Sequence, residues 1–202
     1  MNDTLLKVAY RMQQAGNPSE AARIYGEILM TNPRHFQALY MLAYVHFGNA
    51  SYETAERLFE MASNVDPKFV DAYFARGCAL LNLGRYDAAM RSFDKAVALK
   101  RDHADALVNR GVCLLELRRH EDAFRDFANA LAIDPRHVEA LVNRGAGLLE
   151  LKRYRDALPS LERALVLAPK HAKAAINRAN ALRGSCSSML RSTASLSIQC
   201  TW

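Results

Sequence analysis

The chain has 202 residues, of which half are hydrophobic and 24% are charged, with a formal net charge of +6. This composition is typical of an ordinary globular protein and argues against general disorder. The start lacks the uninterrupted apolar segment of a signal peptide, and no stretch reaches the roughly 20 apolar residues of a membrane span. A cytoplasmic location is therefore expected, without a membrane partner.

The positive charge is concentrated in the last part of the chain. Residues 1–170 hold 23 Lys and Arg against 21 Asp and Glu, a net of +2. Residues 171–202 hold Lys173, Arg178, Arg183 and Arg191 and no acidic residue. Because the main body is nearly neutral, it is not expected to carry a basic face for nucleic acid.

A 34-residue period runs through most of the chain, in units that begin at Asn2, Phe36, Val70, Ala104, Val138 and Ala172. Position 8 is always small: Ala9, Ala43, Gly77, Gly111, Gly145 and Ala179. Position 20 is alanine and position 24 is large: Ala21, Ala55, Ala89, Ala123 and Ala157, then Tyr25, Phe59, Phe93, Phe127 and Leu161. Position 32 is proline except in the third unit: Pro33, Pro67, Arg101, Pro135 and Pro169.

The columns of this repeat predict two packed helices in each unit. Positions 4, 8 and 11 share one face of a first helix, and positions 20, 24 and 27 share one face of a second helix. Small residues at positions 8 and 20 allow the helices to approach closely, and the large residue at position 24 fills the adjacent space. Each unit is then a helical hairpin that must stack on its neighbours to bury its apolar surface.

These columns resemble those of the tetratricopeptide repeat, over about residues 2–183. The resemblance implies an all-α fold, an α-solenoid in the form of a right-handed superhelix, with five helical hairpins and one extra helix. The predicted domains are a repeat array at 1–183 and a non-repeat tail at 184–202 that is disordered or packed loosely on the array end. Because the sixth unit stops halfway, one hypothesis is that the tail is a truncation or frame-shift product of a longer repeat protein.

Catalytic and metal-binding motifs are not expected in this chain. His35, His103, His137 and His171 share position 34, but each lies on a separate repeat without a recurring acidic or Cys neighbour, which favours a role in the turns. The four cysteines form no C-x-x-C pair, so neither a zinc site nor a structural disulfide is predicted. No cofactor motif is present.

Candidate binding residues lie on the side of the first helices that faces away from the second helices, at positions 2, 5, 9, 12 and 13, with position 6 at the margin. The acidic residues among them are Asp71, Asp105, Glu139, Glu116 and Glu150. The aromatic residues are Tyr40, Tyr44 and Phe74, and the asparagines at position 6 are Asn109, Asn143 and Asn177. The resemblance implies that the first helices line a concave groove, which makes these residues the candidate peptide-binding site.

The asparagines suggest how a ligand is held. An amide side chain both donates and accepts hydrogen bonds, so a regularly spaced row suits the main chain of an extended peptide. This row resembles that in the arrays of O-linked N-acetylglucosamine transferases and related bacterial proteins, where such asparagines contact bound polypeptide. The resemblance implies this role for Asn109, Asn143 and Asn177, but no transferase activity. The alternative is that the asparagines only reflect repeat duplication and that the acids are merely solvated.

Arginine at position 7 of four units is predicted to bridge neighbouring repeats: Arg76, Arg110, Arg144 and Arg178. The family usually has a large apolar residue there. A guanidinium at that position needs acceptors, which an acid or a helix-end carbonyl of the adjacent repeat would supply. Direct contact with a ligand is the alternative.

These features predict an adaptor or scaffold rather than an enzyme, which binds a neutral to basic protein or peptide segment in the groove. One alternative is the substrate-recognition part of a longer glycosyltransferase-type enzyme. A second alternative, a nucleic-acid binder, is disfavoured by the near-neutral body and the acidic groove. The half-finished sixth unit also allows end-to-end self-association.

Overall fold

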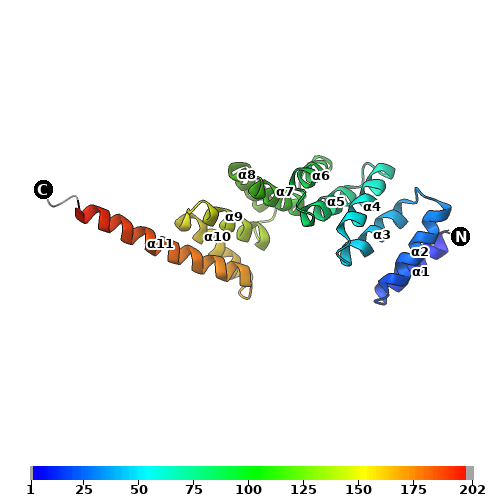
Figure 1. The fold of residues 1–202 in the computed structure, drawn as a ribbon, viewed down its shortest axis with the longest axis horizontal. Coiled ribbons are helices and arrows are strands. Elements are labelled where there is room, and N and C mark those ends of the chain that lie inside the picture. Colours follow the sequence, from blue (N-terminus) through cyan, green and yellow to red (C-terminus); the bar gives the residue numbers. More distant parts are fainter. Residues whose placement is uncertain (1, 199–202) are drawn as a thin grey trace. The chain divides into compact units, whose positions relative to one another are not determined.

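The computed structural model describes residues 2–198, with side chains described through residue 186, and these residues form eleven α-helices and no strand (Figure 1). The first six helices are α1 (Asn2–Gln14), α2 (Pro18–Thr31), α3 (Phe36–Gly48), α4 (Tyr52–Val65), α5 (Val70–Asn82) and α6 (Tyr86–Leu99). The other five are α7 (Ala104–Glu116), α8 (His120–Ile133), α9 (Val138–Glu150), α10 (Tyr154–Leu167) and α11 (Ala172–Ile198). The predicted all-α helical repeat is confirmed, whereas the right-handed superhelix stays a prediction.

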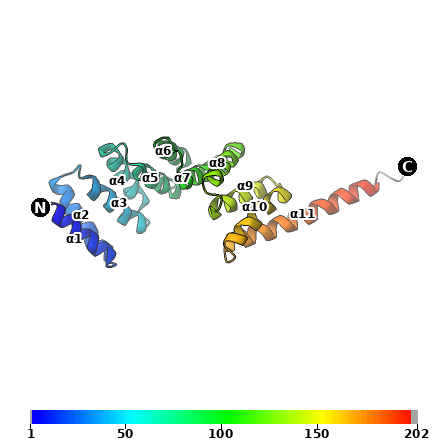
Figure 2. The same cartoon turned by 180° about the vertical axis from the view of Figure 1, so that it is seen from behind.

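The chain divides into two compact units, the first ending at Cys113 and the second beginning at Leu114. In the first unit α1 packs against α2, α3 against α4, and α5 against α6, while α2–α3 and α4–α5 contacts join successive hairpins (Figure 2). In the second unit α9 packs against α10, which packs against α11, and α8 contacts α9. Within each unit, therefore, helices that are neighbours in sequence are neighbours in space.

The small residues at position 8 lie where two helices touch. A Cβ on Gly77 of α5 would come within 2.5 Å of the Phe93 ring of α6. A Cβ on Gly145 of α9 would come within 2.6 Å of the Leu161 side chain of α10. Phe93 and Leu161 are fully buried. The predicted packing of position 8 against position 24 is therefore confirmed in both units.

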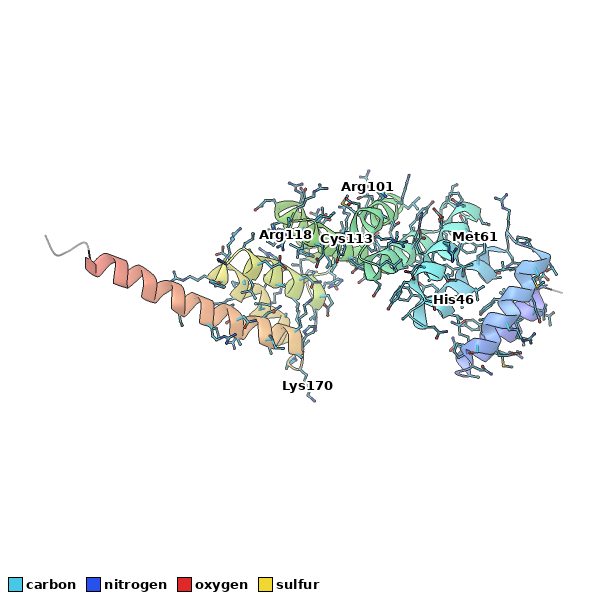
Figure 3. All side chains as sticks on the ribbon, in the orientation of Figure 1. His46, Met61, Arg101, Cys113, Arg118 and Lys170 are labelled. Carbon is cyan, nitrogen blue, oxygen red and sulfur yellow. The ribbon has the colours of Figure 1, made fainter. Side chains whose placement is uncertain are left out.

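The turn inside each hairpin uses the left-handed backbone conformation at position 15. The φ angles there are 78° at Gly16, 56° at Ala50, 67° at Gly84, 60° at Arg118 and 58° at Lys152 (Figure 3 labels Arg118). Glycine adopts this conformation without strain, whereas a residue with a Cβ does so at some cost. Two of the five repeats have glycine at this position, and the other three adopt the same conformation with a residue that has a Cβ.

The histidines at position 34 cap the first helices. The imidazole Nδ1 atoms of His35, His103, His137 and His171 accept hydrogen bonds from the backbone N–H three residues later, at 3.3, 3.4, 3.3 and 3.2 Å. Each bond satisfies one of the N–H groups that a helix start leaves without an intrahelical partner. The predicted turn position is confirmed, and the capping role is an addition to it, since histidine is not among the usual N-cap residues.

The arginines at position 7 contact acids of the preceding repeat in three of four cases. Arg76 lies 2.7 Å from Glu56 and 2.6 Å from Glu60, and Arg110 lies 2.7 Å from Asp94. Arg178 approaches Glu162 at 3.5 Å. The inter-repeat bridge is confirmed for these three arginines.

The exception among these arginines is Arg144. It is exposed and forms no ion pair among the described residues. The preceding repeat has Ala128 at the position that holds Glu60, Asp94 or Glu162 in the other repeats. The bridging interpretation therefore fails for Arg144, because its acidic partner is missing.

The last helix differs from the expected tail, because α11 continues through residue 183 to Ile198. The backbone of 184–198 is therefore helical rather than disordered. Gly184 does not end the helix but packs against α10, where a Cβ would come within 2.5 Å of the Tyr154 ring. Residues 199–202 lie outside the described part, and the end of the array at 183 stays a prediction.

The described residues also bear on the expectations for cysteines, metal sites and membrane spans. Cys113 of α7 is buried, Cys78 is partly buried and Cys186 is exposed, and none of these three forms a disulfide (Figure 3 labels Cys113). The described side chains contain no group of three or more potential metal ligands. No helix within residues 2–198 combines the length and the apolar character of a membrane span.

Replacing Gly77 by Val should destabilise the protein by about 1–3 kcal/mol, because the new side chain overpacks the contact with Phe93. The matched variant Gly26→Val changes a glycine of α2 that has no atom within 4 Å of its Cβ position. It should stay within about 0.5 kcal/mol of the parent. Urea unfolding followed by circular dichroism measures both, and equal midpoints for the two variants would contradict the packing argument.

Candidate functional site

In the first unit, side chains of three first helices come together on one surface, which we call the α3–α5–α7 face. Its members are Tyr40 and Tyr44 of α3, Asp71, Phe74 and Cys78 of α5, His103, and Asp105 and Asn109 of α7. Contacts cross from one repeat to the next, since the Phe74 and His103 rings lie 4.8 Å apart and Asn109 contacts Cys78. The charge of Asp71 acts on both tyrosines and on His103. Six of these eight residues belong to the predicted site.

The aromatic part of the α3–α5–α7 face is built around Tyr40. Its ring stacks against Phe36 and meets Phe69, Phe59 and Tyr44 edge-on, with ring centroids 4.9–5.8 Å apart. This packing holds Tyr40 and the neighbouring Tyr44 in fixed positions. The Tyr44 side chain nevertheless remains 37% exposed, so part of its ring is available to a ligand.

The Tyr44 hydroxyl can act as a hydrogen-bond donor to a ligand. Tyr40 Oη donates to Tyr44 Oη at 3.2 Å, which leaves the Tyr44 hydrogen free to donate outward. Burial raises the pKa of both hydroxyls above their usual value, and the nearby Asp71 carboxylate acts in the same direction. Both groups therefore stay protonated at neutral pH.

Asp71 provides an exposed negative charge beside these rings. It lies in the first turn of α5 and forms no ion pair among the described residues. A carboxylate next to an exposed aromatic ring suits a Lys or Arg side chain, through a charge-assisted hydrogen bond and a cation–π contact.

Asn109 of α7 and Cys78 of α5 form a polar contact between these two helices. Asn109 Nδ2 donates to Cys78 Sγ at 3.6 Å, a weak bond that leaves the amide oxygen and the other N–H available. Burial raises the pKa of the Cys78 thiol to about 11, so the thiol is neutral and a poor nucleophile. Cys78 is thus a packing and hydrogen-bonding member of the face, which its place at position 9 could have indicated.

Three of the predicted site residues of the second unit are engaged between neighbouring repeats. Glu139 Oε1 lies 2.9 Å from His171 Nε2, Asn143 Oδ1 accepts from Lys173 Nζ at 3.1 Å, and Glu150 lies 3.1 Å from Arg118. Since His171 Nδ1 accepts the capping bond, its Nε2 is the nitrogen that donates to Glu139. Only the Glu150–Arg118 pair joins opposite charges, whereas Glu139 receives a hydrogen bond from His171 and the Asn143 amide is uncharged.

The remaining predicted residues have mixed environments. Glu116, at the end of α7, is exposed. Asn177 has a buried Nδ2 without a hydrogen-bond partner among the described residues. Asn109 belongs to the first unit, whereas Asn143 and Asn177 belong to the second. The continuous row of asparagines therefore stays a prediction.

Comparison with known proteins identifies the family. Three models of the tetratricopeptide repeat match residues 12–81, 74–138 and 138–171. The chain belongs to the tetratricopeptide repeat family, as its period and helical hairpins indicate. A search of curated proteins finds no significant match.

Several solved structures have a similar fold. MamA is 21% identical, with a TM-score of 0.76 over 82% of this chain and 97% of that chain. YrrB, described as a TPR protein with an unusual peptide-binding site, is 24% identical, with a TM-score of 0.74 over 84% and 88%. TTC0263, a thermophilic TPR protein of Thermus thermophilus, is 21% identical, with a TM-score of 0.68 over 90% and 99%. At these identities the similarity shows the fold.

The environment of His103 predicts a pH-dependent stability. Burial lowers the pKa of this imidazole below its usual 6.5, although Asp105 acts in the opposite direction. Its contribution to stability is therefore present above about pH 6.5 and lost as the pH falls through the lowered folded pKa. His103→Ser keeps a capping side chain but removes this titration, so its urea midpoint should fall less than that of the parent between pH 7 and 5.

The matched variant His35→Ser makes the same exchange at the start of α3, where the histidine also caps the helix. The difference between its urea midpoint and that of the parent at pH 7 gives the effect of replacing a capping histidine by serine. Identical pH profiles for the parent and His103→Ser would contradict the assignment.

Proposed function

We propose that the chain is a protein-interaction module that binds a segment of a partner polypeptide along the α3–α5–α7 face. The observation that carries this proposal is the presence of unused binding groups on a rigid, packed surface. The Tyr44 ring is partly exposed, Asp71 lacks an ion pair among the described residues, and the Asn109 amide uses only one weak hydrogen bond. Part of the Tyr44 ring is used in the hairpin packing, but the Asp71 carboxylate and the Asn109 amide oxygen have no hydrogen-bond or ion-pair partner among the described residues.

The chemistry of the face defines the kind of segment that binds. The Asn109 amide pairs with a main-chain N–H and C=O of an extended segment, and Tyr44 donates to a further acceptor. Asp71 beside Tyr44 receives a Lys or Arg side chain, which gives the ligand a neutral to basic character at this point. The preference rests on Asp71, because Glu150 of the second unit is paired with Arg118 and Glu139 is hydrogen-bonded to His171.

The comparisons support this proposal through analogy. Membership of the tetratricopeptide repeat family and the unusual peptide-binding site described for YrrB both favour a polypeptide ligand. The resemblance to transferase arrays adds an expected peptide contact for Asn109, and by extension for Asn143 and Asn177. A role as the recognition part of a longer enzyme would use the same face, so one binding experiment addresses both roles.

Asp71→Lys should weaken peptide binding. The probe is a set of fluorescein-labelled peptides selected by the intact parent protein from a random phage-displayed 12-residue library. Charge reversal at Asp71 repels a basic side chain, so the Kd of peptides that carry Lys or Arg should rise about tenfold or more. Fluorescence anisotropy measures the change.

The matched control is Glu53→Lys, which makes the same charge change in the first turn of α4, on a second helix. It should leave every Kd within about twofold, which corresponds to about 0.4 kcal/mol. The proposal is wrong if the library yields no binding peptide, or if both variants weaken binding equally.

A further inference from the structure

A pocket of about 380 Å³ lies at the N-terminal end of the first unit, between the first helices of the first two repeats. Its walls are formed by Leu6 and Tyr10 of α1, Tyr25 of α2 and Met41 of α3. Tyr25 is fully buried and its hydroxyl donates to Gln13 at 3.1 Å, so this wall is held in place with its polar group satisfied. Tyr10 is 50% exposed and stands at the edge. The pocket is largely apolar and suits one large apolar side chain.

Two cations flank this apolar pocket. Lys7 and Arg11 belong to its lining, are separated by one turn of α1, and are exposed. Neither forms a hydrogen bond or an ion pair among the described residues, and the lining contains no acidic residue. Asp3, one turn before Lys7 on the same helix, is the nearest acid in sequence but does not line the pocket.

The adjacent helix α2 provides a paired arginine for comparison. Arg23 of α2 forms ion pairs with both Glu20 and Glu27 on its own helix. The positive charge of Lys7 and Arg11, in contrast, is not offset by a paired acid. A ligand that enters the pocket therefore meets an apolar cavity and two available cations, to which a carboxylate is complementary.

We infer that this pocket binds a large apolar side chain of a partner polypeptide in which an adjacent residue is Asp or Glu. The inference rests on the proposed function and adds a second recognition site to it. Lys7 and Arg11 bind the carboxylate, while Leu6, Tyr10 and Met41 enclose the apolar group. A concave pocket of this size suits a single inserted side chain, whereas a lipid surface would favour protruding apolar residues.

The pocket also gives the ligand a charge pattern. Its cations lie on α1, whereas the exposed carboxylate of Asp71 lies on α5 of the same unit. A segment that occupies both places has its acidic residue at α1 and its basic residue at α5. A segment with charges of one sign only is therefore disfavoured at one of the two places.

The test uses the double variant Lys7→Glu/Arg11→Glu of the intact chain and the same random 12-residue phage library. The parent should enrich peptides in which Phe, Leu or Met stands next to Asp or Glu, with Lys or Arg farther along. The double variant should lose the acidic preference or reverse it to Lys or Arg, while it retains the apolar preference. Its affinity for the acidic peptides selected by the parent should fall about tenfold or more.

The matched control is Arg91→Glu/Lys95→Glu, which reverses two exposed cations at the same spacing on α6, a second helix. It should give the enrichment profile of the parent. Circular dichroism checks folding, and if the reversal variant is unfolded, the neutral pair Lys7→Gln/Arg11→Gln replaces it and should lose the acidic preference.

The outcomes separate this inference from the proposed function. If Asp71→Lys changes the selected peptides but the Lys7 and Arg11 variants do not, the inference is wrong and the proposed function stands. If the parent binds vesicles of anionic lipid and enriches no peptide, both are wrong. Enrichment without any acidic preference in the parent also overturns the inference.

Discussion

The rest of the structure depends on the close contact between the two helices of each hairpin. At Gly77 and Gly145 the backbone of a first helix lies so near Phe93 or Leu161 of the second helix that a Cβ would meet them at 2.5 or 2.6 Å. At this spacing the buried large residue fills the hairpin, and the opposite side of the first helix is left for other contacts. The residues at positions 8 and 24 recur every 34 residues, so binding groups on successive first helices of a unit occupy equivalent places.

The side-chain groups available for binding are those that the fold leaves without a partner. The bridging arginines and capping histidines are engaged by the fold, and so are Glu139, Asn143 and Glu150 of the second unit. The remaining groups of the first unit differ in charge from helix to helix. They are unpaired cations on α1, partly exposed aromatic rings on α3 and an unpaired carboxylate on α5. Such a surface favours a ligand that carries both signs of charge, which a uniformly acidic groove would not do.

Much of the fold can be predicted from the sequence, because the contact between positions 8 and 24 is local and recurs. The capping role of His103 cannot be predicted, because histidine is an unusual N-cap residue. The serine-rich composition after Gly184 likewise gives no indication that α11 continues to Ile198. For the site, the column at position 2 indicates which acids face outward, but not that Glu139 is paired with His171. The sequence does not indicate the pocket at Lys7, because the first repeat diverges from the others and the cations of the pocket have no basic counterpart at the same positions of the other units.

Backbone amide chemical shifts test the central claim most directly, namely that the first helices present the binding surface. The measurement titrates ¹⁵N-labelled intact protein with a peptide selected by it and maps the amides that move. We expect the affected amides to lie on α1, α3, α5 and α7, around Lys7, Tyr44, Asp71 and Asn109. Changes confined to the second helices α2, α4 and α6, with the first helices unaffected, would contradict it.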